Sequence, residues 1–306
     1  MSPGLARAAL GRIAGAAFSL IGVAVLLQLM LRAAPGDPID LLPDAEGQRA
    51  ALEAAWGLDR SLLQVLMDVL QGRLGESLAL RPGAAVAGLV VEASVASAPL
   101  LLGALPLSLL LAVPVARSGR GRAVAAALSA TPIFLFAFGW VSLINELTFA
   151  LMGAGLVSAP PWFALPDQPS ALRTALAALS LAVASGNLSA VANHLLGERS
   201  RARASGWREA LVARGEPTAL PMLRNLLPGA LALLGARSAN LVGGLVVLEK
   251  VMLVPGAGAM LWDAALARDY PLALGLSLAA ATAVVGLSLA CELGRIALDP
   301  RLQGGA

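Results

Sequence analysis

The chain has 306 residues, of which 58% are hydrophobic and only 13% are charged. Soluble domains are about 45–50% apolar and about 25% charged, so this chain has too little polar surface to cover itself in water. Its formal net charge is only +3, which argues against a nucleic-acid partner. The composition therefore predicts an integral membrane protein.

Apolar runs follow one another along the chain at lengths that suit membrane-spanning helices, which need about 20 mostly apolar residues. Six runs are predicted to span the membrane: Ile13–Leu31, Ala93–Ala116, Ala123–Asn145, Thr174–Gly197, Asn225–Leu248 and Tyr270–Cys291. The first is longer than the apolar core of a signal peptide, about 7–15 residues, so we expect it to stay uncleaved. A further run, Leu147–Pro166, contains Pro160, Pro161 and Pro166, and we interpret it as a loop or a short interfacial helix. The predicted fold is an all-α bundle of six transmembrane helices.

Arginine distribution predicts the orientation, because Arg and Lys concentrate in cytoplasmic loops. The segment 33–92 is acidic, with four Arg against nine Asp or Glu. Arginines gather instead in the head, in the loop after the second span, in the 198–224 loop and in the tail: Arg7, Arg12, Arg117, Arg120, Arg122, Arg199, Arg201, Arg203, Arg208, Arg214, Arg224, Arg295 and Arg301. Both termini and the 198–224 loop are therefore predicted to be cytoplasmic.

The organisation predicted from these runs has two parts. Residues 1–92 form the first span and an external segment, and residues 93–301 form a core domain with the 198–224 loop. Within the external segment, 48–71 has the apolar spacing of an amphipathic helix interrupted at Gly57. That helix either helps to bind a solute-delivering protein or lies on the membrane surface, and the sequence does not separate these alternatives.

A short pattern marks the 198–224 loop and the start of the fifth span. It consists of Glu209, Ala210, Gly215, Leu227 and Pro228 at fixed spacing. Gly215 suits a positive φ at the end of a helix, and Pro217 suits the first turn of the next helix. Two short helices at an angle would make a rigid knob that seats in a partner. The simpler alternative is a solvated loop that only obeys the positive-inside rule.

Other motifs occur in a set order along the chain. They are Pro35-Gly36-Asp37-Pro38, Trp56-Gly57-Leu58-Asp59, Gly72-Arg73-Leu74-Gly75-Glu76-Ser77, Val254-Pro255-Gly256-Ala257-Gly258, Arg268-Asp269-Tyr270-Pro271 and Asp299-Pro300-Arg301. Each of them alone marks a turn. Together with the 209–228 pattern they resemble permease subunits of ABC importers of the dipeptide, oligopeptide and nickel class, over about residues 10–301.

This resemblance implies partners and roles. Such permeases act as pairs of the same or homologous chains in the bacterial inner membrane, with cytoplasmic ATP-binding subunits and an external solute-binding protein. Glu209, Ala210, Gly215, Leu227 and Pro228 would couple the permease to its ATPase. The ATPase would use ATP, and this chain would bind no cofactor and no metal. The chain departs from the family pattern where Gly206-Trp207, Leu211 and Asn225 stand.

Polar residues inside the predicted spans are candidates for the substrate path. Arg237 lies near the middle of the fifth span, where a charge is costly and usually faces the bundle or a water-filled path. It could bind a substrate carboxylate, with Asn187 and Asn240 as further path residues, or it could anchor the bundle, with Glu146 or Asn240 as its partner. For Asn187, Asn193 and His194, hydrogen bonding between helices is the simpler reading.

Several activities have no supporting motif. Lys250 is the only lysine, so a phosphate-binding Gly-x4-Gly-Lys-Ser/Thr loop does not occur. With one His and one Cys, the common zinc sites do not occur either. The chain is thus predicted to be a transporter subunit and no enzyme. The alternative function is an ATP-independent secondary transporter, against which the sequence shows no clear inverted repeat.

Overall fold

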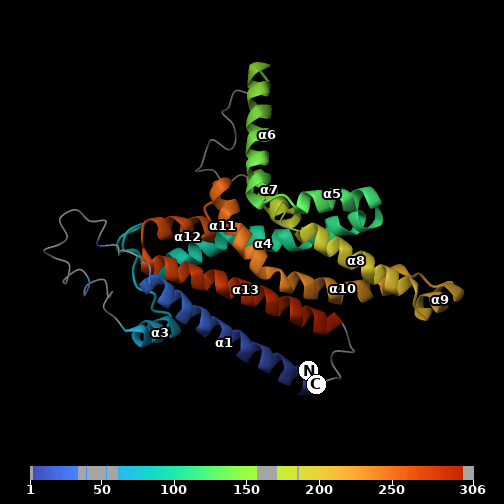
Figure 1. Ribbon diagram of the computed structural model, residues 1–306, viewed down its shortest axis with the longest axis horizontal. Helices are drawn as coiled ribbons and strands as arrows, with labels where there is room; N and C mark the ends of the chain where they lie inside the picture. Colours follow the sequence, from blue (N-terminus) through green and yellow to red (C-terminus); the bar gives the residue numbers. More distant parts are fainter. Residues whose placement is uncertain are drawn as a thin grey trace. The chain divides into compact units, whose positions relative to one another are not determined.

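The computed structural model describes residues 3–33, 39, 53, 61–156, 171–184 and 186–298. These residues are predominantly helical, with one isolated bridge between Glu76 and Ala85 (Figure 1). The helices are α1 (Pro3–Ala33), α3 (Leu62–Leu70), α4 (Val86–Arg117), α5 (Gly119–Ser129), α6 (Ile133–Gly153), α7 (Ala171–Val183), α8 (Asn187–Arg203), α9 (Gly206–Ala213), α10 (Ala219–Ala236), α11 (Ser238–Val251), α12 (Ala257–Leu266) and α13 (Tyr270–Leu298).

The described residues contain four single helices that are long and apolar enough to cross a membrane, namely α1, α4, α6 and α13. Two further candidates are bent pairs, α7 with α8 and α10 with α11. If each pair is one span, the described chain has six, in agreement with the sequence. The motifs at 35–38, at 56–59 and at 299–301, with most of 48–60, lie outside the described residues.

The third span begins later than the sequence predicts. Ala123–Asn145 is not one helix, because α5 ends at Ser129 and α6 starts at Ile133 with Pro132 at its N-cap. Proline has no N–H to donate and disfavours helical geometry in the residue before it, so the helix cannot run through this point. The span is Ile133–Gly153, and it takes in the first residues of the run that the sequence predicts to be a loop.

The fourth and fifth predicted spans are each broken near the middle. The axes of α7 and α8 differ by 53°, and those of α10 and α11 by 54°. Gly186 precedes α8 with φ +78°, a left-handed conformation that favours glycine. Arg237 separates α10 from α11 with φ −97° and ψ 3°. Both breaks coincide with short polar stretches, residues 185–187 and 237–238. Each run as a whole is still apolar enough to pass as one span, so hydropathy averaged over a full span does not reveal them.

The chain forms two compact units, and the larger comprises residues 1–15, 99–254 and 284–306. Its core contains Leu181, Leu241 and Leu248, with small alanines between them. Gly244 lets helices approach closely there, since a Cβ at this position would lie 3.1 Å from Ile133. Small residues at helix contacts are typical of membrane bundles, where close packing replaces the hydrophobic effect. The two-part division at residue 92 that the sequence suggests stays a prediction.

The smaller unit comprises residues 16–98 and 255–283. Its core joins the first turns of α4 and α13 through Val86, Leu89 and Leu272. Gly275 makes this contact possible, because a Cβ there would lie 2.7 Å from Cγ1 of Val86. The unit therefore holds the starts of two spanning helices together.

Within this unit, Asp269 at the start of α13 binds the loop that precedes α4. Its side chain is fully buried, and its Oδ2 accepts hydrogen bonds from Ser77 Oγ at 2.5 Å and from the backbone N–H groups of residues 78, 79 and 80 at 3.1 Å each. Its Oδ1 accepts from the N–H of Leu272 at 3.3 Å, which caps α13. Two motifs that the sequence shows as separate turns thus meet at one carboxylate.

Candidate coupling loop and transport path

The 198–224 loop folds as a short helix between two longer ones. The loop runs from the end of α8 through α9 to the first turn of α10, and α9 lies at the end of the α8–α10 pair, away from the two breaks (Figure 1). Glu209 and Ala210 on α9 are exposed, and Trp207 and Arg208 are half-buried. The sequence predicts two short helices at an angle, whereas the structure has one short exposed helix, α9, between the longer α8 and α10.

Gly215 closes α9 with a specific turn. Its φ is +69°, its N–H donates to the carbonyl of Val212 at 3.0 Å, and the N–H of Glu216 donates to the carbonyl of Leu211 at 3.0 Å. This pair of bonds is a Schellman motif, which satisfies the last carbonyls of a helix and needs a left-handed residue. A Cβ at this position would meet nothing within 4 Å. The requirement for glycine is therefore conformational rather than steric.

Pro217 does not stand where the sequence predicts. It lies before Thr218, the N-cap of α10, instead of in the first turn of that helix. The prediction of a proline inside the first turn is wrong, because α10 starts two residues later, at Ala219. The Schellman turn and Pro217 together separate α9 from α10.

Leu227 and Pro228 belong to a different environment from the rest of the pattern. Both lie inside α10 and are half-buried, rather than in the exposed loop. The next residue, Gly229, faces His194 of α8, since a Cβ on Gly229 would lie 2.4 Å from the histidine Nε2. The second half of the pattern therefore lies inside α10, which contacts α8 at Gly229, and the first half lies on the exposed helix α9.

Arg237 and Asn187 meet where the two broken spans approach each other. Arg237 Nε donates to Oδ1 of Asn187 at 2.9 Å, and Asn187 Nδ2 donates to the carbonyl of Leu181 at 2.9 Å. Leu181 lies in the last turn of α7, where carbonyls lack helical partners. A Cβ on Gly186 would lie 3.2 Å from Nη2 of Arg237. The guanidinium of Arg237 therefore lies against Gly186 at the break between α7 and α8. Arg237 itself is the residue at the break between α10 and α11.

The remaining polar candidates are placed differently. Asn240 lies in the first turn of α11 and is exposed. Asn193 is exposed and His194 is half-buried on α8. Of the three residues proposed for the path, the structure thus joins Arg237 and Asn187. Arg237 hydrogen-bonds to Asn187, a pairing that the sequence did not suggest.

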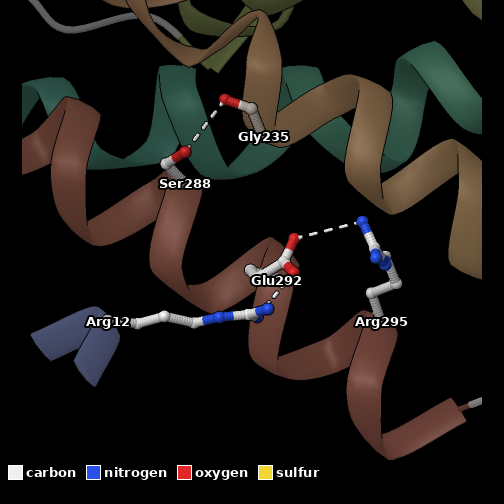
Figure 2. A network of polar contacts seen from close by, with 5 residues as sticks. All are labelled: Arg12, Gly235, Ser288, Glu292 and Arg295. Carbon is white, nitrogen blue, oxygen red and sulfur yellow. Dashed lines mark hydrogen bonds and ion pairs between the residues drawn. The ribbon is translucent and has the colours of Figure 1, made fainter. Parts of the chain in front are cut away.

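The C-terminal helix supports the break at Arg237 from another side. Figure 2 shows Ser288 of α13 reaching Gly235, whose carbonyl accepts from Ser288 Oγ at 3.2 Å. One turn further along α13, Glu292 pairs with Arg12 of α1 at 2.5 Å and with Arg295 at 3.5 Å. The contact between Ser288 and Gly235 was not predicted from the sequence, because a serine in an apolar run carries no local signal for its partner.

Comparisons with known proteins identify the family. A family model described as the binding-protein-dependent transport system inner membrane component matches residues 104–304. A putative peptide permease protein of Brucella suis is 28% identical over 309 residues, covering 93% of this chain and 95% of the relative. The oligopeptide transport system permease protein AppB of Bacillus subtilis is 24% identical over 308 residues, with the same two coverages.

A shorter match is to a permease named for nickel import. The nickel import system permease protein NikB of Staphylococcus aureus is 37% identical over 92 residues, which cover 29% of this chain and 26% of that protein. These relatives support an importer permease over an ATP-independent carrier. The chain belongs to the binding-protein-dependent transport system inner membrane components, as a multi-pass permease subunit of an ABC importer of the peptide and nickel class.

Proposed function

We propose that this permease carries short peptides or chemically related small solutes. The observation that carries the proposal is the match along nearly the whole chain to permeases named for peptides, at 93% coverage. We further propose that it pairs with a second permease, receives its solute from an external binding protein and is driven by cytoplasmic ATPases. Both termini would then lie in the cytoplasm, as the arginine distribution predicts.

The substrate contact in this proposal is Arg237. A guanidinium close to the breaks of two spans can bind a carboxylate in a path of low dielectric, where charge-assisted hydrogen bonds are strong. Asn187 orients it through the 2.9 Å bond to Nε. Peptides carry a terminal carboxylate, which a cation in this position suits.

The test is uptake by the reconstituted importer of one peptide with a free C-terminal carboxylate and of its C-terminal amide. Loss of a charged hydrogen bond costs about 1.5–3 kcal/mol, or about 10–100-fold. Arg237→Gln should lower uptake of the free acid by that factor and leave the amide within about twofold. The matched control Arg237→Lys keeps the charge and should keep the preference. Equal losses for acid and amide with Arg237→Gln would instead make Arg237 a structural anchor.

The coupling element in this proposal is the exposed helix α9 with its Schellman turn. Because Gly215 needs a left-handed conformation, which costs an L-residue about 1–2 kcal/mol, even a small side chain should disturb the turn. We expect Gly215→Val to reduce ATPase binding and transport by at least about tenfold, since it combines this cost with β-branching. The matched control is Gly215→Asn, because Asn tolerates this conformation and the site has space for it.

Both variants are measured by co-purification of the ATPase subunits and by ATP-dependent uptake. If Gly215→Val kept normal ATPase binding and uptake, the turn would have no part in coupling. Equal defects in Gly215→Val and Gly215→Asn would show that conformation is not the relevant property.

A further inference from the structure

Helix α3 carries an apolar stripe on its outward face. Leu63, Met67 and Leu70 are 69%, 48% and 65% exposed. Their spacing of four and three residues places them on one side of the helix. Large apolar side chains that gather on an exposed surface usually mark a binding face. The stripe therefore needs a partner.

The backbone ends of α3 are satisfied within the helix itself. Ser61 Oγ accepts from the N–H of Gln64, and the Gln64 side chain accepts from the N–H of Ser61, which forms a capping box. At the other end the N–H of Gly72 donates to Val69 and that of Arg73 to Asp68, as in a Schellman motif. A helix with both ends closed in this way can leave bulk water without leaving these donors and acceptors unpaired.

The charge on α3 is also neutralised locally. Asp68 is its only charged residue, and Arg73 Nη2 lies 2.7 Å from Oδ1 of Asp68. The helix and its closing turn thus carry no net charge. Attraction to a charged surface has no source here, and the apolar stripe is the feature left for recognition.

The level of α3 along the membrane normal follows from its tether. Only residues 71–73 separate α3 from Leu74, and extended residues span at most about 3.6 Å each. Leu74 packs in the core of the smaller unit, where its Cδ1 would lie 3.5 Å from a Cβ on Gly275. That core joins the first turns of α4 and α13. Helix α3 is therefore held where two spanning helices enter the membrane.

Neighbouring side chains in the same unit fit this level. Val91 and Val95, in the first three turns of α4, are 62% and 67% exposed on a spanning helix. Trp262 of α12 is 46% exposed, and tryptophan is enriched at membrane–water interfaces.

We infer that α3 is an interfacial helix, whose Leu63, Met67 and Leu70 stripe inserts into the lipid surface on the membrane face where α4 and α13 begin. Helices of this kind lie in the plane of the membrane and bury an apolar face at the boundary between headgroups and acyl chains. Because α3 carries no net charge, the apolar stripe drives the binding, and anionic lipids add nothing to it. The inference uses the membrane location of the chain and is independent of its substrate.

The test places a fluorescent label on each edge of α3 in the importer, reconstituted in lipid nanodiscs. Cys291 is the only native cysteine and is first replaced by Ala. Single cysteines at Met67 or Leu70 report the stripe, and one at Gln71, the exposed polar C-cap residue whose side chain takes no part in the capping box, is the matched control. Quenching by headgroup-level doxyl lipid is compared with quenching by aqueous iodide, in zwitterionic and in anionic nanodiscs.

Doxyl lipid should quench the stripe labels at least about threefold more than the control label, as expected for an apolar face in the interface. Aqueous iodide should quench the control label more than the stripe labels. The ratio should be the same in both lipid mixtures. Iodide quenching of stripe and control labels alike would overturn the inference. Protection of the stripe from both quenchers would also overturn it, because protein would then cover the stripe. So would protection that appears only when the solute-binding protein is added.

Discussion

The carboxylate of Asp269 accepts five hydrogen bonds in the smaller unit, and its charge can be removed almost without changing its shape. In Asp269→Asn, Oδ1 of the amide can face Ser77 and the three backbone donors, but the negative charge is lost. Hydrogen bonds to charged groups contribute about 1.5–3 kcal/mol and neutral ones about 0.5–1.5 kcal/mol, so each bond weakens by about 1 kcal/mol. The four weakened bonds to one oxygen give about 4 kcal/mol. The bond from the Leu272 N–H is lost, because the amide NH2 that replaces Oδ1 cannot accept it, and this adds about 1.5–3 kcal/mol. Bonds that share one carboxylate are not additive, and we therefore expect about 3–5 kcal/mol of destabilisation.

The assay is reversible unfolding of the purified permease in mixed micelles, followed by tryptophan fluorescence. The matched control is Glu76→Gln, which removes one negative charge from the same loop at an exposed side chain and should stay within about 0.5 kcal/mol of the wild type. A double variant with Ser77→Ala should lose less than the sum of the two single losses, because Ser77 Oγ donates to the same oxygen. If Asp269→Asn matched Glu76→Gln, the reasoning that this carboxylate holds the unit together would be refuted.

Two further predictions concern the larger unit. Gly229→Ala should destabilise the permease by about 1–3 kcal/mol through overpacking, since the new Cβ would lie 2.4 Å from Nε2 of His194. Adding His194→Ala should restore most of that loss in the same unfolding assay, and no rescue would mean that the clash is not with His194. Glu292→Gln should cost about 1 kcal/mol or less, because its pairs are partly exposed, and the loss should shrink in high salt. Glu198→Gln, in an exposed i,i+3 pair, is the control with a smaller expected effect, and a salt-independent loss for Glu292→Gln would contradict an electrostatic contribution.

The number of spans and the loop with the coupling pattern could be predicted from the amino-acid sequence alone. Lipid cannot hydrogen-bond to the backbone, so each crossing must be an apolar helix of nearly constant length. That constraint acts on each segment separately, which is why it can be read locally. Gly215 is a similar case, because the turn it closes involves only neighbours within five residues.

Helix boundaries inside apolar sequence are harder to predict. Pro132 ends a helix in the middle of a predicted span, and the breaks at Gly186 and Arg237 interrupt runs whose average hydropathy still suits a single span. A lipid-facing segment is equally apolar whether it is straight or bent by about 54°. The direction of a helix is set by what it packs against, and composition does not encode that.

Long-range contacts account for the remaining features. Local sequence explains why Asp269 starts a helix and why residues 75–80 form a turn, but the bond between them joins positions up to 192 residues apart. The same holds for Arg237 with Asn187, 50 residues apart, and for Ser288 with Gly235, 53 apart. Membrane insertion is governed by the free energy of each segment in lipid, which its own residues determine. Which polar groups then meet depends on how the inserted helices pack. The free energy of packing depends on pairs of helices rather than on any single helix.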